Sequence, residues 1–267
     1  MMIIDKKDKY SGAPILSVRN LSIEFEQYDR GWNRKKVKAI TSLDADVYAG
    51  EILAVVGASG SGKSLLAHSV LGILPGNAEV SGEIKFMGQK LDDELCQKLR
   101  GSQISLIPQS VDFLDPLMKV GRQVCGVRGS MERAREVLAR YGLGEEVMDM
   151  YPHQLSGGMA RRVLIAAAVM DDAELIIADE PTPGLDVEKA METLSHFRQL
   201  ADEGRGILLI THDIDMALEV ADRIAVFYDG TTVETCTAAA FREGKLQHPY
   251  SRAFFDALPQ SGFNAEK

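Results

Sequence analysis

Seven small residues and one lysine stand in a row in the stretch GASGSGKS, and residues of these types could surround a phosphate. They are Gly57, Ala58, Ser59, Gly60, Ser61, Gly62, Lys63 and Ser64. The stretch fits the pattern G-x-x-x-x-G-K-[ST], in which Lys63 reaches the outer phosphates and the Ser64 hydroxyl ligates Mg²⁺. The apolar run ILAVVG precedes it and residues at helical spacing follow it, as this chemistry requires. The sequence therefore predicts a phosphate site in preference to a glycine turn that only serves packing.

A pair of carboxylates forms the second candidate, at the end of the apolar run LIIADE. A strand that ends at Asp179 places this carboxylate at the sheet edge where α/β proteins bind ligands, so it would hold Mg²⁺ through water. Glu180 would orient and polarise a water molecule that attacks a phosphate. Two solvated acids at the start of a loop are the alternative, which the phosphate-binding loop disfavours.

Strands and helices alternate along most of the chain. Period-two alternation predicts a half-buried strand over residues 15–26, then a hairpin loop over 27–36 and one or two strands over 37–51. Apolar runs predict buried strands at 52–57, 104–109, 174–181 and 206–213. Helical spacing predicts helices at 63–74, 131–143, 159–170, 187–204 and 216–222. This order is typical of an α/β protein with a largely parallel sheet.

Composition excludes several classes of protein. The chain has 267 residues, of which 45% are hydrophobic and 26% are charged, as in soluble globular proteins. No run approaches the roughly 18 apolar residues of a membrane span, and the first ten residues lack the apolar core of a secretory signal. The net charge of −9 disfavours sequence-independent binding of nucleic acid. Cys96, Cys125 and Cys236 have neither metal-site nor disulfide spacing, which fits a reducing cytosol.

The segment LSGGM is the third motif. Ser156, Gly157 and Gly158 precede the predicted helix MARRVLIAAAV, and they form a second bare helix N-terminus suited to phosphate. On its own this segment would indicate only a capped helix start. Together, GASGSGKS, LSGGM and LIIADE resemble the ATP-binding cassette (ABC) ATPases, in which this signature also lies between the other two motifs. The resemblance extends from about Ile15 to Pro259.

The resemblance assigns further residues to the site. Gln109 resembles the glutamine that contacts the metal and senses the transmembrane partner, and His212 resembles the histidine that contacts the γ-phosphate. Asp186 resembles the aspartate of the segment called the D-loop. Phe25 falls where the family often has an aromatic residue that stacks on adenine, with Tyr28 as the alternative and plain core packing as the other interpretation of Phe25.

The resemblance also implies a fold and an assembly. The fold is α/β, a P-loop NTPase core with a parallel sheet, an antiparallel β subdomain and a helical subdomain inserted at about residues 110–170. One ABC ATPase domain spans residues 15–259, with 1–14 as an N-terminal extension and 260–267 as a C-terminal tail. Two chains enclose two ATP molecules with Mg²⁺, each between the phosphate-binding loop of one chain and the LSGG of the other. Ala160 stands where many members have a polar residue, and Gly184 stands where many have a small side chain such as alanine. Neither difference removes a catalytic group.

Within the ABC ATPases, the resemblance favours the energy-supplying subunit of an importer. The segments SLIPQSVDFLDPLMKVGRQV and HPYSRAFFDALP resemble peptide and nickel importer ATPases, and the chain length slightly favours nickel or another chelated metal over peptides. Such a subunit works at the cytoplasmic face of the cell membrane as a peripheral protein. Its implied partners are transmembrane permease subunits, a second ATPase subunit in a heterodimer or homodimer, and an extracytoplasmic substrate-binding protein; no nucleic acid is expected.

Two other functions stay open at this point. One is a soluble cassette ATPase that acts on nucleic acid or ribosomes, which the acidic balance and the single cassette disfavour. The other is a regulatory cassette that binds nucleotide with little turnover, which the presence of Glu180 and His212 disfavours.

Overall fold

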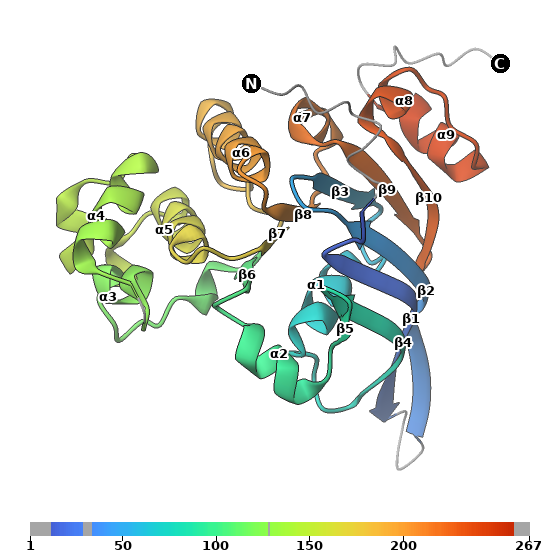
Figure 1. The fold of residues 1–267 in the computed structure, drawn as a ribbon, viewed down its shortest axis with the longest axis horizontal. Coiled ribbons are helices and arrows are strands. Elements are labelled where there is room, and N and C mark those ends of the chain that lie inside the picture. Colours follow the sequence, from blue (N-terminus) through green and yellow to red (C-terminus); the bar gives the residue numbers. More distant parts are fainter. Residues whose placement is uncertain (1–11, 29–33, 128, 259–267) are drawn as a thin grey trace.

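One ten-stranded sheet organises the protein. The structure is a computed structural model that describes residues 12–28, 34–127 and 129–258. The strands follow the order β5-β4-β1-β2-β10-β9-β3-β8-β7-β6, so an antiparallel half and a parallel half share the sheet (Figure 1). The α/β architecture predicted from the sequence is confirmed.

Four strands make the antiparallel half. They are β1 (Leu16–Tyr28), β2 (Arg34–Val47), β4 (Ala78–Phe86) and β5 (Gln89–Lys90). The β1–β2 hairpin is longer than the sequence predicts, because Gln27 pairs with Lys35 inside the predicted loop 27–36. The part of that loop at residues 29–33 lies outside the described residues. The predicted one or two strands of 37–51 are a single strand, β2.

Five parallel strands make the other half. They are β3 (Ile52–Gly57), β6 (Ile104–Ile107), β7 (Leu175–Asp179), β8 (Gly206–Ile210) and β9 (Arg223–Tyr228). Every residue of β3, β7 and β8 is buried, as expected for parallel strands that are covered on both faces. The antiparallel strand β10 (Thr231–Thr237) joins the halves, because it pairs with β9 and, through Thr231, with Ser42 of β2.

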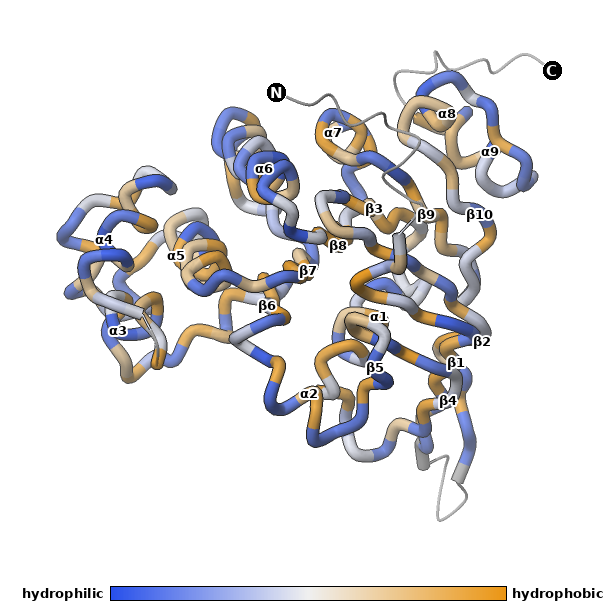
Figure 2. The backbone as a smooth tube through the Cα atoms, viewed as in Figure 1, coloured by the Kyte–Doolittle hydropathy of each residue, from blue (hydrophilic) through white to orange (hydrophobic). Residues whose placement is uncertain are grey.

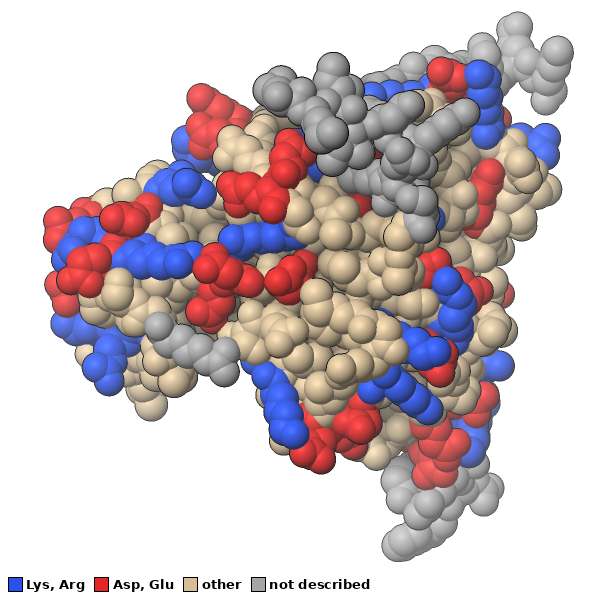
Figure 3. All heavy atoms as spheres, in the orientation of Figure 1, with Lys and Arg blue, Asp and Glu red and all other residues tan. Residues whose placement is uncertain are grey.

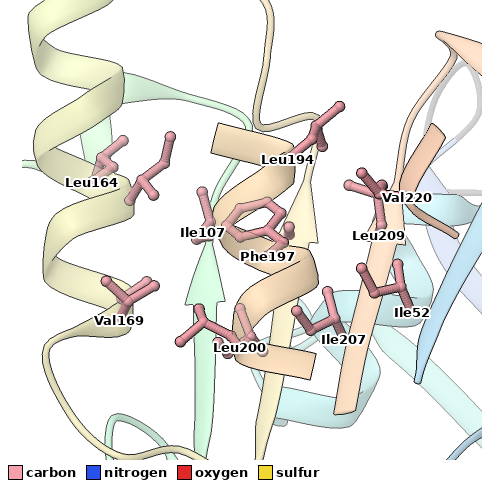
Figure 4. Close-up of a cluster of buried hydrophobic side chains, with 14 of the residues drawn as sticks. Ile52, Ile107, Leu164, Val169, Leu194, Phe197, Leu200, Ile207, Leu209 and Val220 are labelled. Carbon is pink, nitrogen blue, oxygen red and sulfur yellow. The ribbon is translucent and has the colours of Figure 1, made fainter. Parts of the chain in front are cut away.

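Helices cover both faces of the parallel half. They are α1 (Lys63–Leu71) on one face, and α6 (Val187–Asp202) and α7 (Ile214–Val220) on the other. Side chains of β3 alternate between two cores: Leu53 packs in a cluster with α1 and the antiparallel strands, and Ile52 packs in a cluster with α6 and α7. Figure 4 shows the second cluster, to which α6 contributes Leu194, Phe197 and Leu200.

Glycine ends α1 earlier than the sequence predicts. The helix stops at Leu71 because Gly72 adopts a left-handed conformation with φ 61°. The smaller helices are α2 (Asp93–Leu99), α8 (Ala238–Arg242) and α9 (Pro249–Asp256). The colouring in Figure 2 places many apolar residues in the central strands and polar residues on the outer turns of α6.

A helical arm stands to one side of the sheet, between β6 and β7 (Figure 1). We use this name for residues 111–169, which contain η1 (Val111–Phe113), α3 (Val120–Cys125), α4 (Met131–Arg140), η2 (Glu145–Asp149), η3 (Pro152–Gln154) and α5 (Gly157–Val169). The last helix begins at Gly157, so the two signature glycines lie in its first turn and do not precede it. Within the described ranges, no helix combines the length and the apolar character needed to cross a bilayer.

Candidate active site

The phosphate-binding loop connects β3 to α1 and needs its glycines for steric reasons. A Cβ atom on Gly57 would lie 2.1 Å from the carbonyl oxygen of Phe227 in β9. Gly62 has φ 98°, and a Cβ atom there would lie 2.8 Å from the side chain of Ile40. Ile40 of β2 and Phe227 of β9 thus pack directly against this loop. Small residues are therefore required by the fold as well as by any ligand that approaches the backbone.

Lys63, the first residue of α1, is buried at the base of this loop. Its Nζ atom donates hydrogen bonds to the carbonyl oxygens of Gly57 and Ala58, each at 2.9 Å. Burial lowers the pKa of Lys63, and the nearby carboxylates of Glu180 and Asp179 oppose that shift. The ammonium group is held by loop carbonyls at a position from which phosphate oxygens could replace them as acceptors.

Asp179 ends β7 and has an unsatisfied oxygen. The residue is 2% exposed, and its Oδ1 atom has no hydrogen-bond partner among the described residues. Burial raises the pKa of Asp179, and a hydrogen bond with the Ser64 side chain opposes this shift. A buried carboxylate oxygen without a partner is costly unless a ligand satisfies it. Together with the Ser64 hydroxyl it fits Mg²⁺, which binds proteins through one or two oxygens and leaves other positions to water and phosphate.

The described residues offer no group of three or more His, Cys, Asp or Glu side chains that could hold a metal by themselves.

Glu180 follows directly and has a strained backbone with φ 49°. Its N–H group donates to the carbonyl oxygen of Ile210 at 2.9 Å, which ties the start of the β7–α6 loop to β8. Its Oε2 atom lies 2.7 Å from Nδ1 of His212, whose side chain is 71% exposed. With Glu180 ionised, the Nδ1–H group of His212 donates this bond. Non-glycine residues with positive φ cluster at functional sites, where the surrounding structure holds the strain.

Lys63, Glu180 and His212 line one open cavity of about 340 Å³, and Asp179 is not one of its lining residues. The cavity is lined by Ser59, Gly60, Gly62, Lys63, Ser64, Leu65, Gln109, Glu180 and His212. The carboxyl ends of β3, β6, β7 and β8 carry these residues to one edge of the sheet, as expected for ligand sites in α/β proteins. The cavity therefore brings together side chains that can bind phosphate, hold a metal and activate water.

The signature residues do not line this cavity. The Ser156 Oγ atom caps α5 by accepting a hydrogen bond from the Met159 N–H at 3.3 Å. Gly158 lies against the D-loop, because a Cβ atom on it would be 3.2 Å from the Gly184 carbonyl oxygen. Asp186 also lies apart, and its side chain caps α6 by accepting from Lys189 N–H at 2.8 Å. Within the described part of one chain, the start of α5 is therefore separate from the cavity that contains Lys63 and Glu180.

Phe25 lies in β1 and is half-buried against the core that contains α1. It pairs across strands with Val37 and Ala78, and it is not one of the residues lining the cavity. The backbone of Tyr28 belongs to β1, but its side chain lies outside the described part of the chain. Stacking on adenine stays a prediction for these residues.

Sequence reasoning missed Arg161. This residue of α5 is 7% exposed, and its Nη1 atom donates to the carbonyl oxygen of Pro108, directly before Gln109, at 2.8 Å. The available signal was an arginine on the face of α5 that also carries the buried Leu164, Ile165 and Ala168. A buried charge on an apolar helix face is uncommon unless it has a partner.

The comparisons with known proteins agree with this geometry. A family profile described as "ABC transporter" matches residues 40–183. The chain belongs to the ABC transporter family. It is an ATP-binding protein with the fold of that family and an ATPase, so these predictions from the resemblance are confirmed.

Relatives of this ABC protein match over most of their length. A dipeptide transport ATP-binding protein, DppD, of Lactococcus lactis is 36% identical over 92% of this chain and 74% of its own length. An oligopeptide transport ATP-binding protein, OppD, of Haemophilus influenzae is 36% identical over 95% of this chain and 81% of its own length. Among solved structures, a dimeric ATP-binding cassette, MJ0796, bound to ADP and Pi, has a TM-score of 0.72 and 27% identity, and the match covers 84% of this chain and 98% of that one.

Proposed function

We propose that this ABC ATPase energises a peptide importer by closing on ATP as one half of a cassette dimer. The main support for this proposal is that the start of α1 and the start of α5, the two proposed phosphate-binding helix starts, lie apart within one chain. Lys63 and Glu180 line one cavity, whereas the exposed Ser156 and Gly157 lie outside it. A second cassette that presents its own signature would complete the site. The MJ0796 structure is itself described as dimeric and as a post-hydrolysis state.

The proposed hydrolysis rests on positioning and charge. Backbone N–H groups of residues 57–64 and the Lys63 ammonium would bind the phosphates. Ser64 and Asp179 would hold Mg²⁺, which would supply positive charge next to the phosphate oxygens. Glu180 holds the attacking water in line, and the 2.7 Å contact with His212 fixes the orientation of its carboxylate. Gln109 closes the cavity from the side of β6. Such preorganised groups stabilise the transition state without further reorganisation.

The segment after Gln109 offers a surface for membrane subunits. Phe113 and Leu117 are 58% and 86% exposed, and Met118 is also exposed beside them in the chain. Exposed apolar side chains of this size suit contact with another protein. We propose that permease subunits dock here, which places the chain at the cytoplasmic face of the membrane. A second ATPase subunit, identical or homologous, and an extracytoplasmic binding protein complete the proposed system.

Peptides are the proposed cargo. The relatives described above are named for dipeptides and oligopeptides, and their names do not support the preference for nickel that the chain length suggests. On the face shown in Figure 3, acidic and basic side chains are interspersed, unlike the basic tract of a nucleic-acid binder. This supports a transporter over a cassette that acts on nucleic acid.

Co-purification from native cells in mild detergent tests the proposal. Permease subunits and a cassette partner are expected to accompany the chain. After reconstitution into vesicles with the binding protein, ATP hydrolysis should rise when peptides are added. Stimulation by nickel or metal chelates alone would contradict the proposal that peptides are the cargo. Recovery of ribosomes or DNA without permeases would contradict the proposal that the chain belongs to a transporter.

A further inference from the structure

Arg161 connects two segments that the proposed mechanism uses separately. It lies on α5, three residues after the signature glycine Gly158. Its guanidinium reaches the residue that directly follows β6, where Nη1 donates to the Pro108 carbonyl oxygen at 2.8 Å. Pro108 immediately precedes Gln109, which lines the cavity. One side chain therefore spans from the signature helix to the segment that carries Gln109.

The environment of Arg161 is unfavourable for a residue that serves packing alone. It is almost fully buried, and its Nε atom has no hydrogen-bond partner within the described part of the chain. Burial lowers the pKa of Arg161, whereas the charges of Glu180 and Asp179 oppose the shift, so the guanidinium lies close enough to sense the carboxylates of the cavity. A half-satisfied buried cation calls for a functional explanation, because an apolar residue would be cheaper there.

The neighbouring Arg162 shows what an arginine does here without such a link. Its Nη1 atom donates to the carbonyl oxygens of Tyr141 and Gly142 at 2.9 and 3.0 Å, and its Nε atom donates to that of Gly158, one turn earlier in α5, at 3.3 Å. All three acceptors belong to the helical arm, so Arg162 stabilises the arm internally. It provides a control of the same residue type on the same helix.

We propose that Arg161 is a positioning residue that holds the Gln109 segment to the signature helix, so that both move as one body during ATP hydrolysis. This inference rests on the proposed function of the cavity. Docking of a membrane subunit on the segment after Gln109 would then shift the signature of the same chain, which serves the nucleotide of the partner cassette. Arginine suits this role because its planar fork carries several donors in a fixed geometry.

The kinetics of the complete transporter complex separate this role from plain stability. In Arg161→Met, we expect kcat for ATP to fall about tenfold, with KM within about twofold, because the lost bond acts on positioning and not on ground-state binding. Arg162→Met should keep kcat near the wild-type value at equal folded fraction. If Arg161→Met retains wild-type kcat, or loses it only as much as Arg162→Met does, the proposal is wrong.

A double-mutant cycle identifies the route of the effect. If Arg161 acts through Gln109, adding Arg161→Met to Gln109→Ala slows hydrolysis no further, whereas independent effects multiply. Multiplying effects, or a Gln109→Ala variant as fast as the wild type, would overturn the proposal. Should Arg161→Met not fold, Arg161→Lys and Arg161→Gln replace it, with Lys expected to retain more activity; failure of all three to fold would assign Arg161 to stability alone.

These outcomes are distinguishable from failure of the proposed function. If the wild-type complex hydrolyses no ATP, both proposals fall together. If the wild type is active and Glu180→Gln is inactive while Arg161→Met keeps its kcat, only the inference about Arg161 fails.

Discussion

Two helices of this protein begin in nearly the same way but in different surroundings. The phosphate-binding loop before α1 is packed against β9 and the antiparallel half, and it shares a cavity with Gln109, Glu180 and His212. The signature at the start of α5 is exposed, and an added Cβ atom on Gly157 would meet nothing within 4 Å. Among the described residues, the first helix start shares its cavity with the proposed catalytic side chains, and the second does not line that cavity.

The difference shows that two glycine-rich helix starts can have different roles in one reaction, one in catalysis and one in binding. A glycine-rich helix start attracts phosphate, because its first N–H groups lack backbone partners within the helix and the helix dipole is positive there. The loop before α1 also has Lys63, the buried carboxylate of Asp179 and the proposed water-orienting carboxylate of Glu180 near it. We therefore expect the signature to contribute binding to a nucleotide that is held by another loop.

The largest effect is expected in the cavity at the start of α1. Glu180→Gln removes the carboxylate that orients water, and we expect ATP turnover to fall by about 10²- to 10⁴-fold. Nucleotide affinity should stay close to the wild-type value, because Glu180 does not hold the phosphates. Steady-state hydrolysis and binding of a fluorescent ATP analogue measure the two quantities, and unchanged turnover would remove Glu180 from its proposed role.

The next prediction concerns the pH dependence of stability at the interface between α6 and the helical arm. His196 of α6 is 6% exposed and contacts Arg140 and Tyr141 of the arm through its two ring nitrogens. Burial, with the charges of Arg140 and Arg205, lowers the pKa of His196 to about 4. Since the unfolded chain binds this proton near pH 6.5 and the folded chain does not, stability should fall as pH drops from about 6.5 to 4.

The full loss of unfolding free energy is about 3 kcal/mol, and it is reached once the pH falls below the folded-state pKa of His196, about 4. Urea unfolding at pH 7 and at pH 4.5 measures it. His196→Gln, which keeps a hydrogen-bonding side chain but does not titrate, should lose less stability on acidification than the wild type. Equal losses in both proteins would contradict the prediction.

A substitution in the signature tests whether the start of α5 contacts the nucleotide of a partner cassette. Gly157→Asp adds a negative charge in the first turn of α5, which should leave unfolding free energy unchanged or raise it by a few tenths of a kcal/mol. The same charge would repel the phosphates held by the partner cassette, so turnover should fall by about 10- to 100-fold. Gly76→Asp, in a surface turn with equally open space, is the control. Parallel changes in stability and turnover would argue against the proposed dimer site.

The smallest effect tests the cap that follows the D-loop. Asp186→Ala removes the side chain that accepts the Lys189 N–H bond at 2.8 Å, and loss of such a cap costs about 1 kcal/mol. Asp186→Asn should restore most of that stability. If Asp186 has only this role, turnover per folded molecule stays unchanged; a fall in turnover for Asn as well as Ala would support a role at the dimer interface.

The local parts of the candidate site are visible in the sequence. Residues 57–64 are consecutive, so their pattern, the apolar strand before them and the helix after them are all visible without a fold. Asp179 and Glu180 are visible for the same reason, because they end an apolar run. Gln109 and His212 needed the family resemblance, since a single Gln or His after a strand carries little information alone.

Contacts between distant residues were not predictable in this way. The Glu180–His212 contact joins positions 32 residues apart, and the Arg161–Pro108 bond joins positions 53 residues apart. Neither spacing follows from periodicity, because the order in which parallel strands pack decides which loops meet. The extension of β1 and β2 and the end of α1 at Leu71 were likewise set by cross-strand pairing and by the conformation of Gly72.

The sequence by itself thus determined the phosphate-binding loop, the two carboxylates, the signature and the family, because these depend on residue types at short spacing. The tertiary structure decided which of them form one cavity. It gathered the ends of β3, β6, β7 and β8 around Lys63, and it left the signature exposed on the helical arm. The physical reason is that strand order and helix packing fix distances between segments, whereas sequence patterns report only what lies within a few residues.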